Sequence, residues 1–121
     1  MSYRDIHEYN EKRAELNEVV MRHAGQSMKR FWNLDGAVYR EGALPEKTKE
    51  LLGLVASLVL RCDDCIYYHI NESFQKGASM EEIEETLSIG LIVGGSITIP
   101  HIRRAFKAFE ELQESAGNSQ G

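Results

Sequence analysis

The segment from Pro45 to Arg61 constrains the fold more than any other part of the chain. Its apolar residues cover nearly the whole circumference of a helix: Leu51, Leu52, Leu54, Val55, Leu58, Val59 and Leu60. A helix that is apolar on all sides packs against several other helices or against another subunit. Pro45 suits the first position of such a helix, where no backbone N–H is needed. The sequence therefore predicts a central helix over about 45–61.

Five further segments have the apolar spacing of helices, and no segment has the alternation typical of a strand. The predicted helices precede a polar tail over 115–121 and cover about 3–22, 26–40, 62–76, 79–94 and 98–112. Ser79 and Glu82 form a capping box at the start of one of them. Gly90 and Gly94, four residues apart, would let another backbone approach closely. We therefore expect an all-α bundle of about six helices.

Length and charge narrow the range of functions. The 121 residues suffice for one domain with its own core, and no linker divides them, so we expect a single domain over 1–121. A net charge of -5 argues against a dedicated nucleic-acid or anionic-membrane surface. No segment supplies the roughly twenty consecutive apolar residues of a membrane span. The first residues lack the apolar run of a signal peptide, which favours a reducing, cytoplasmic location.

The two cysteines carry the clearest chemistry. Cys62 and Cys65 are separated by two residues, and His69 follows four residues later. On a helix these positions share one face, and the two Cα atoms would lie about 5.5 Å apart, within disulfide range. The positive end of the helix dipole and the neighbouring Arg61 favour thiolate over thiol. Because His69 could take the thiol proton, the sequence predicts a dithiol with its own base.

Glu50 completes this candidate site. If the helices over 45–61 and 62–76 pack antiparallel around a turn at Cys62, Glu50 lies at about the same level along the helix pair as His69. A carboxylate beside an imidazole raises its basicity and fixes its tautomer. We therefore expect a contact between the Glu50 and His69 side chains.

Some features compete with this interpretation. Asp63 and Asp64 lie between the cysteines, and carboxylates there should raise the pKa of the thiols unless they point to solvent. A structural zinc site would use the same four residues, but ligands at i, i+3 and i+7 of a straight helix span about 10 Å, too far for one ion. Each residue is also common in plain packing or on a surface. A non-catalytic helical oligomer with a structural CxxC therefore stays open.

The order Glu50, eleven residues, Cys62, two residues, Cys65, three residues, His69 resembles the motif of the alkylhydroperoxidase AhpD-like branch of the carboxymuconolactone decarboxylase family. The flanking chain, with a motif core over about 44–112, is similar to that family's core. The stretches that carry this similarity are Leu44-Pro45-Glu46-Lys47, Gly94-Gly95 and Pro100-His101-Ile102-Arg103-Arg104-Ala105.

The resemblance implies an AhpD-like helical bundle that assembles into trimers or hexamers, with active sites near subunit contacts. It implies that Cys62 and Cys65 cycle between dithiol and disulfide while reducing a hydroperoxide, with Glu50 and His69 as a proton relay. For this cycle we expect an external dithiol reductant protein as partner, and we expect no cofactor and no metal. One departure from the best-studied pattern is Asp64, which stands where that pattern has a second histidine. The dithiol points away from lactone decarboxylation, which in this family does not depend on a CxxC.

Two questions stay open at the level of sequence. Adjacency to His69 favours Cys65 as the attacking thiol, whereas nearness to the helix start favours Cys62; of the two we prefer Cys65. The same dithiol could also serve a general disulfide reductase or electron relay for a partner protein. Candidate pocket-lining residues are Trp32, Tyr67, Tyr68 and His101.

Overall fold

The computed structural model describes residues 3–120 and confirms the all-α prediction. Within these residues the chain forms no strand; it forms one short 3-10 helix, η1 (Ser96–Thr98), and the α-helices α1 (Ile6–His23), α2 (Gln26–Val38), α3 (Glu46–Leu60), α4 (Asp63–Gln75), α5 (Met80–Gly94) and α6 (Ile99–Gln120). Most helix ends lie within a few residues of the predicted ones. None of these helices has a stretch long and apolar enough to cross a membrane.

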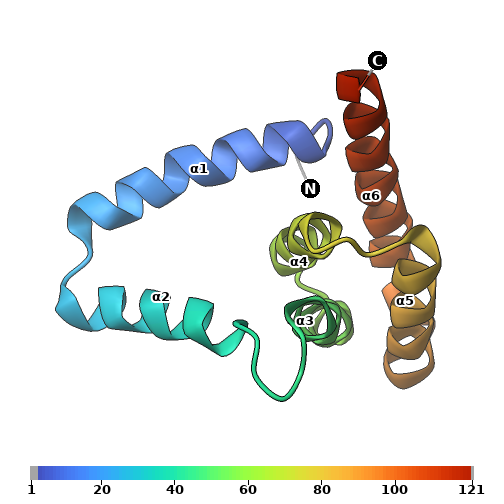
Figure 1. Cartoon of the computed structure of the whole chain (residues 1–121), viewed down its shortest axis with the longest axis horizontal. Helices are drawn as coiled ribbons and strands as arrows, with labels where there is room; N and C mark the ends of the chain where they lie inside the picture. Colours follow the sequence, from blue (N-terminus) through green and yellow to red (C-terminus); the bar gives the residue numbers. More distant parts are fainter. Residues whose placement is uncertain (1–2, 121) are drawn as a thin grey trace.

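Helices α3, α4, α5 and α6 build the hydrophobic core. In Figure 1, α3 and α4 lie side by side in the middle, with α5 and α6 beyond them. The largest fully buried apolar side chains of these four helices are Leu54, Leu58, Ile66, Ile70, Ile83, Leu87 and Phe109. The predicted central position of α3 is therefore confirmed, although two of its apolar residues, Leu52 and Leu60, are exposed.

Close packing of α5 on α3 depends on one of the two glycines noted in the sequence, Gly90. A Cβ added at Gly90 would overlap the side chain of Leu58. A Cβ added at Gly94 would instead meet Cγ2 of Thr98 at 2.7 Å, and it would be only in ordinary contact with α3, 3.7 Å from the Cα of Val59. The contact at Gly90 fixes one side of α3, whose other side faces α4.

Helices α1 and α2 lead away from this core, and we call residues 16–38 the arm (Figure 1). The start of α1 is anchored, because Ile6 and Tyr9 are buried. No residue of α2 is buried, although it has an apolar face. The large exposed apolar residues of the arm are Leu16, Val19, Met21, Met28, Phe31, Trp32, Leu34 and Val38. A short helix without tertiary packing is only marginally stable in water.

Helix α6 runs further than the sequence indicated. The polar tail was expected from residue 115, but the helix continues to Gln120. Contacts with α1 support this last part: the backbone N–H of Ile6 donates to Glu111 (2.9 Å), and the Ser115 hydroxyl lies 2.7 Å from Nε2 of His7. A polar composition therefore did not end the helix here.

Candidate active site

The turn between α3 and α4 places the cysteines. Arg61 adopts a left-handed conformation (φ 60°), and its N–H bonds the carbonyl of Leu58 (2.9 Å) while that of Cys62 bonds the carbonyl of Ser57 (3.1 Å). These bonds close the end of α3 in the manner of a left-handed C-cap. The chain then reverses, so α4 runs back along α3 as the sequence analysis expected.

Cys62 is the N-cap of α4, and Cys65 lies in its first turn. The Sγ of Cys62 accepts a hydrogen bond from the N–H of Cys65 (3.3 Å), and the two sulfurs are at disulfide-bonding distance, with Cα atoms 5.3 Å apart. Cys62 therefore precedes the helix, whereas the sequence analysis had placed it within the helix. The free N–H groups and positive dipole end at this position stabilise a thiolate.

The expected contact between Glu50 and His69 is present. Nδ1 of His69 lies 2.9 Å from Oε1 of Glu50, and both side chains are buried. With Nδ1–H donating to the carboxylate, Nε2 is left as the basic nitrogen. Burial raises the pKa of the Glu50 carboxyl above its ordinary value, while the hydrogen bond and charge of His69 act in the opposite direction.

Gly53 gives the imidazole its space, and the sequence analysis did not identify it. A Cβ added at Gly53 would lie 2.5 to 2.7 Å from three ring atoms of His69. The signal available in the sequence was a glycine inside an otherwise apolar helix, three residues after Glu50. Any side chain at this position would push the ring away from its carboxylate partner.

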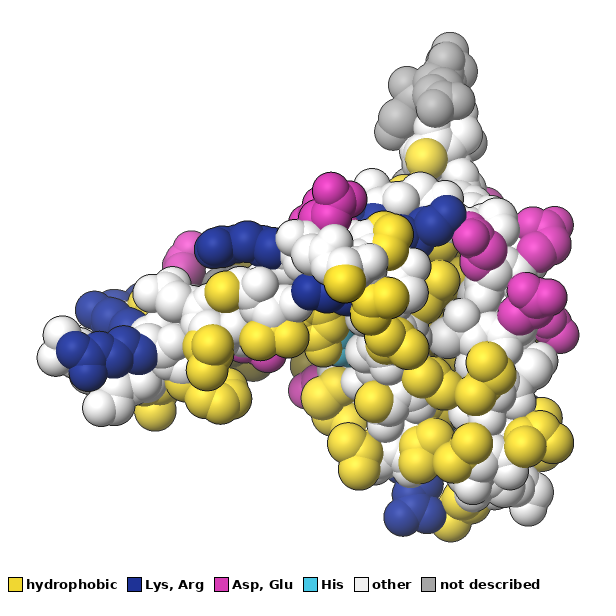
Figure 2. All heavy atoms as spheres, turned by 60° about the horizontal axis from the view of Figure 1, so that its bottom comes forward, with side chains coloured by type: hydrophobic (Ala, Val, Ile, Leu, Met, Phe, Trp, Pro, Cys, Tyr) yellow, Lys and Arg dark blue, Asp and Glu magenta, His cyan; other side chains and the backbone are white. Residues whose placement is uncertain are grey.

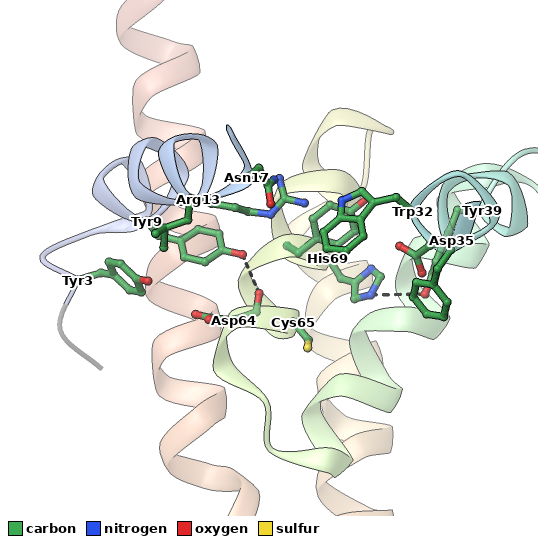
Figure 3. A pocket seen from close by; sticks show the side chains of 13 residues that line it. Tyr3, Tyr9, Arg13, Asn17, Trp32, Asp35, Tyr39, Asp64, Cys65 and His69 are labelled. Atoms are coloured by element: carbon green, nitrogen blue, oxygen red, sulfur yellow. Dashed lines mark hydrogen bonds between the residues drawn. The ribbon is translucent and has the colours of Figure 1, made fainter. Parts of the chain in front are cut away.

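A cavity of about 600 Å³ lies between α1, α2 and α4, beside His69 (Figure 3). Its lining includes Cys65 and His69 but not Cys62. The other lining residues are largely aromatic, and they are Tyr3, Tyr9, Arg13, Leu16, Asn17, Phe31, Trp32, Asp35, Tyr39, Asp64 and Tyr68. Of the four residues expected to line a pocket, Trp32 and Tyr68 line this cavity. Tyr67 lines a second, smaller cavity, and His101 lines neither.

Tyr39 is a second residue that the sequence analysis missed. Its hydroxyl lies 3.5 Å from Nε2 of His69, and the two rings are 5.3 Å apart between centroids. Burial raises the pKa of Tyr39, and the carboxylates of Asp35 and Glu50 add to this effect, so the phenol stays protonated and can donate to Nε2.

The two aspartates between the cysteines differ in their surroundings. Asp63 is held at 2.7 Å by Nδ1 of His101 and at 3.1 Å by the guanidinium of Arg104. Asp64 is exposed, and its backbone carbonyl accepts a hydrogen bond from the hydroxyl of Tyr9 (2.8 Å). Solvent therefore screens one carboxylate, and ionic partners neutralise the other.

Among residues 3–120, no group of three or more His, Cys, Asp or Glu side chains is arranged to hold a metal ion. Glu50 and His69 meet along the α3–α4 pair, and Cys65 and His69 line the same cavity. Their arrangement suits thiol chemistry beside a buried base.

The raised pKa of Glu50 makes stability depend on pH. Above the ordinary value of 4.5, the folded chain binds the Glu50 proton more tightly than the unfolded chain does. As the pH rises from that value through the folded-state pKa, the wild type should therefore lose stability relative to Glu50→Gln, which does not titrate. Urea unfolding followed by circular dichroism from pH 4 to pH 8 measures this difference. A difference that grows in favour of the wild type with rising pH would contradict the prediction.

Known proteins are similar to this chain in sequence and in structure. The chain matches the carboxymuconolactone decarboxylase family over residues 25–111. A curated but uncharacterised protein of Cupriavidus necator is 28% identical over 86 residues, which cover 71% of this chain and 76% of that protein.

Solved structures are similar over nearly the whole chain. A crystal structure from Thermotoga maritima, at 58% identity and a TM-score of 0.86, covers 93% of this chain and 96% of its own. It is described as a carboxymuconolactone decarboxylase family protein and a candidate participant in an antioxidative response. The apo form of a protein of the same family from Legionella pneumophila, at 27% identity and a TM-score of 0.81, covers 88% of this chain and 95% of its own.

Proposed function

The chain belongs to the carboxymuconolactone decarboxylase family, and from this premise we propose that it is a thiol-dependent peroxidase of the AhpD-like kind. The observation that carries the proposal is that one member of each of two pairs lines the same cavity. Cys65 belongs to the disulfide-forming Cys62–Cys65 pair at a helix N-terminus, and His69 belongs to the buried Glu50–His69 pair, one helical turn after Cys65. The antioxidative role suggested for the Thermotoga maritima protein points the same way.

The proposed reaction begins at Cys65, which lines the cavity together with His69. Nε2 of His69 takes the thiol proton, and the thiolate attacks one peroxide oxygen, so that the O–O bond breaks and a sulfenic acid forms. The leaving alkoxide takes the proton from His69 and departs as an alcohol. The thiol of Cys62 then displaces water from the sulfenic acid, which gives the disulfide. The two thiols lose two electrons in total, and an external dithiol protein restores them.

Glu50 and Tyr39 support His69 in this scheme. Glu50 holds the ring and stabilises the imidazolium that forms in the first step. The family's second histidine is replaced by Asp64, whose side chain is exposed. The hydroxyl that faces Nε2 in this structure belongs to Tyr39. A dithiol that must be reduced again in every cycle fits a reducing compartment, so we propose a cytoplasmic location.

A titration of thiols tests the proposal. One equivalent of cumene hydroperoxide is added to the reduced protein, and free thiols are counted. We expect both thiols to disappear and to return with dithiothreitol. Cys62→Ser and Cys65→Ser, which each keep one thiol, should form no intramolecular disulfide. Two thiols that survive the peroxide would refute a peroxidase.

A disulfide reductase or electron relay is the second candidate, because Cys65 is exposed and a partner protein could reach it. Turnover with a protein disulfide, compared with turnover of peroxide, separates the two functions. If Cys65→Ser changes neither rate, a non-catalytic helical oligomer with a structural CxxC is the remaining interpretation.

We also propose a homo-oligomer, a trimer or hexamer, in which a second copy covers the arm. No residue of α2 is buried within one chain, and its apolar residues Leu34 and Val38 are 60% and 57% exposed. Figure 2 shows apolar side chains at the surface along the arm and over the adjoining face of the core. The same chemistry on both surfaces suits contact between identical chains.

Mutating the arm should break this assembly. Leu34→Asp combined with Val38→Asp, two residues outside the cavity lining, should lower the mass measured by light scattering to that of a monomer. Lys29→Asp, a charge change on the same exposed helix, should leave the mass unchanged. A wild-type protein that is already monomeric at micromolar concentration would overturn the proposal.

A further inference from the structure

The Asp63 carboxylate joins the start of α4 to α6. Its Oδ1 lies 2.7 Å from Nδ1 of His101, and its Oδ2 lies 3.1 Å from a guanidinium nitrogen of Arg104. The Asp63 and His101 side chains are only 12% and 17% exposed. These contacts connect the CxxC to the segment His101–Arg104, which has no part in the proposed reaction.

The position of Asp63 gives this cluster its chemical meaning. Asp63 is the first residue of α4, directly after the capping Cys62 and two residues before Cys65. A carboxylate at this place disfavours a nearby thiolate by like-charge repulsion. Since Asp63 is largely shielded from water, salt and solvent would screen this repulsion only weakly.

Arg104 cancels that charge. A guanidinium stays protonated at every accessible pH, so the Asp63–Arg104 pair is neutral overall. Tyr67 and Asp64 are ionisable groups near this pair. Burial raises the pKa of Tyr67, with Asp63 adding to the effect, so Tyr67 carries no charge at neutral pH. Asp64 is exposed and therefore screened.

We propose that Arg104, with His101, is a positioning residue for the dithiol: it holds Asp63 in a neutral cluster, so that the N-terminal dipole of α4 can stabilise a cysteine thiolate. The inference rests on the proposed function, because only a redox-active pair needs a reactive thiolate. It also accounts for acidic residues between the cysteines, which by themselves would make the thiols less reactive. No bond forms or breaks in the cluster itself.

The test measures thiolate directly, without peroxide. The fully reduced protein reacts with iodoacetamide at pH 6 to 9, and mass spectrometry assigns the labelled cysteine; the chain has only two. Arg104→Gln should slow alkylation at pH 7 by about tenfold, which corresponds to one unit in the thiol pKa. Arg104→Lys keeps the charge and should react nearly as fast as the wild type. Asp63→Asn should react faster.

The decisive variant is the double substitution Asp63→Asn with Arg104→Gln. If the role is electrostatic, removing the carboxylate should restore the alkylation rate that Arg104→Gln lost. If the double variant is as slow as Arg104→Gln, the cluster acts only through packing and the inference is overturned. Should Arg104→Gln fail to fold by circular dichroism, unchanged rates in Asp63→Asn would overturn it equally. A protein that shows the expected alkylation pattern but reduces no peroxide would refute the proposed function and leave this inference standing.

Discussion

Replacing His69 by glutamine is expected to slow peroxide reduction at pH 7 by about 10²- to 10⁴-fold, the usual contribution of a positioned acid–base group. Glutamine can still fill the space near Glu50, but it cannot take the thiol proton or return it to the leaving alkoxide. Stopped-flow measurement of disulfide formation in the reduced protein, with excess cumene hydroperoxide and no reductant, isolates this step. His23→Gln, an exposed histidine at the end of α1, is the matched control and should change nothing.

The pH profile distinguishes a base from a structural residue. Above the ordinary thiol pKa of about 8.5, thiolate forms without help, so the defect of His69→Gln should shrink as the pH rises towards 10. A defect of equal size at every pH would instead indicate that the substitution disturbed the fold. Glu50→Gln should have a smaller effect in the wild type and almost none in the His69→Gln background, because the two residues act as one unit.

The parts of the fold that the sequence predicted depend on local patterns. The apolar circumference of 45–61 predicted the central α3, and the capping box at Ser79 is present with both of its hydrogen bonds. The Glu50–His69 contact could also be predicted. A short turn between two antiparallel helices determines which residues of one helix lie level with which residues of the other. Helix period and turn position were sufficient for these inferences.

The parts that the sequence did not reveal depend on distant contacts. Asp63 meets His101 and Arg104 across 38 and 41 positions of chain, and no local pattern indicates that pairing. Tyr39 reaches Nε2 from the end of α2, 30 residues before His69. The course of the arm was equally hidden, because its apolar residues have no buried contacts in one chain from which a direction could be inferred.

The role of Gly53 is visible only in three dimensions, since the residue that needs the space, His69, belongs to the next helix. The position of Cys62 outside the helix was equally hidden, because the left-handed turn at Arg61 uses a residue that seldom adopts positive φ. Both cases concern backbone geometry at a helix junction, where apolar periodicity carries no information.

Gly53→Ala should therefore damage both the stability and the activity of this protein. Its new methyl group would stand 2.5 to 2.7 Å from three atoms of the imidazole, so the ring must leave Glu50 or the helices must separate. Overpacking of this kind costs about 1–3 kcal/mol, against a gain of up to about 1 kcal/mol from alanine's helix propensity.

Gly36→Ala isolates the local effect, because it makes the same change inside α2 at a position with no atom within 4 Å. Gly36→Ala should gain only the stability that alanine's helix propensity provides. The free energies of unfolding of Gly36→Ala and Gly53→Ala, measured with urea, should therefore differ by about 1–3 kcal/mol. Peroxide reduction should fall at least tenfold in Gly53→Ala, since a displaced imidazole loses its carboxylate partner, and should be unchanged in Gly36→Ala. If both variants kept full activity and gained equal stability, the close seat of His69 against Gly53 would have no part in the reaction.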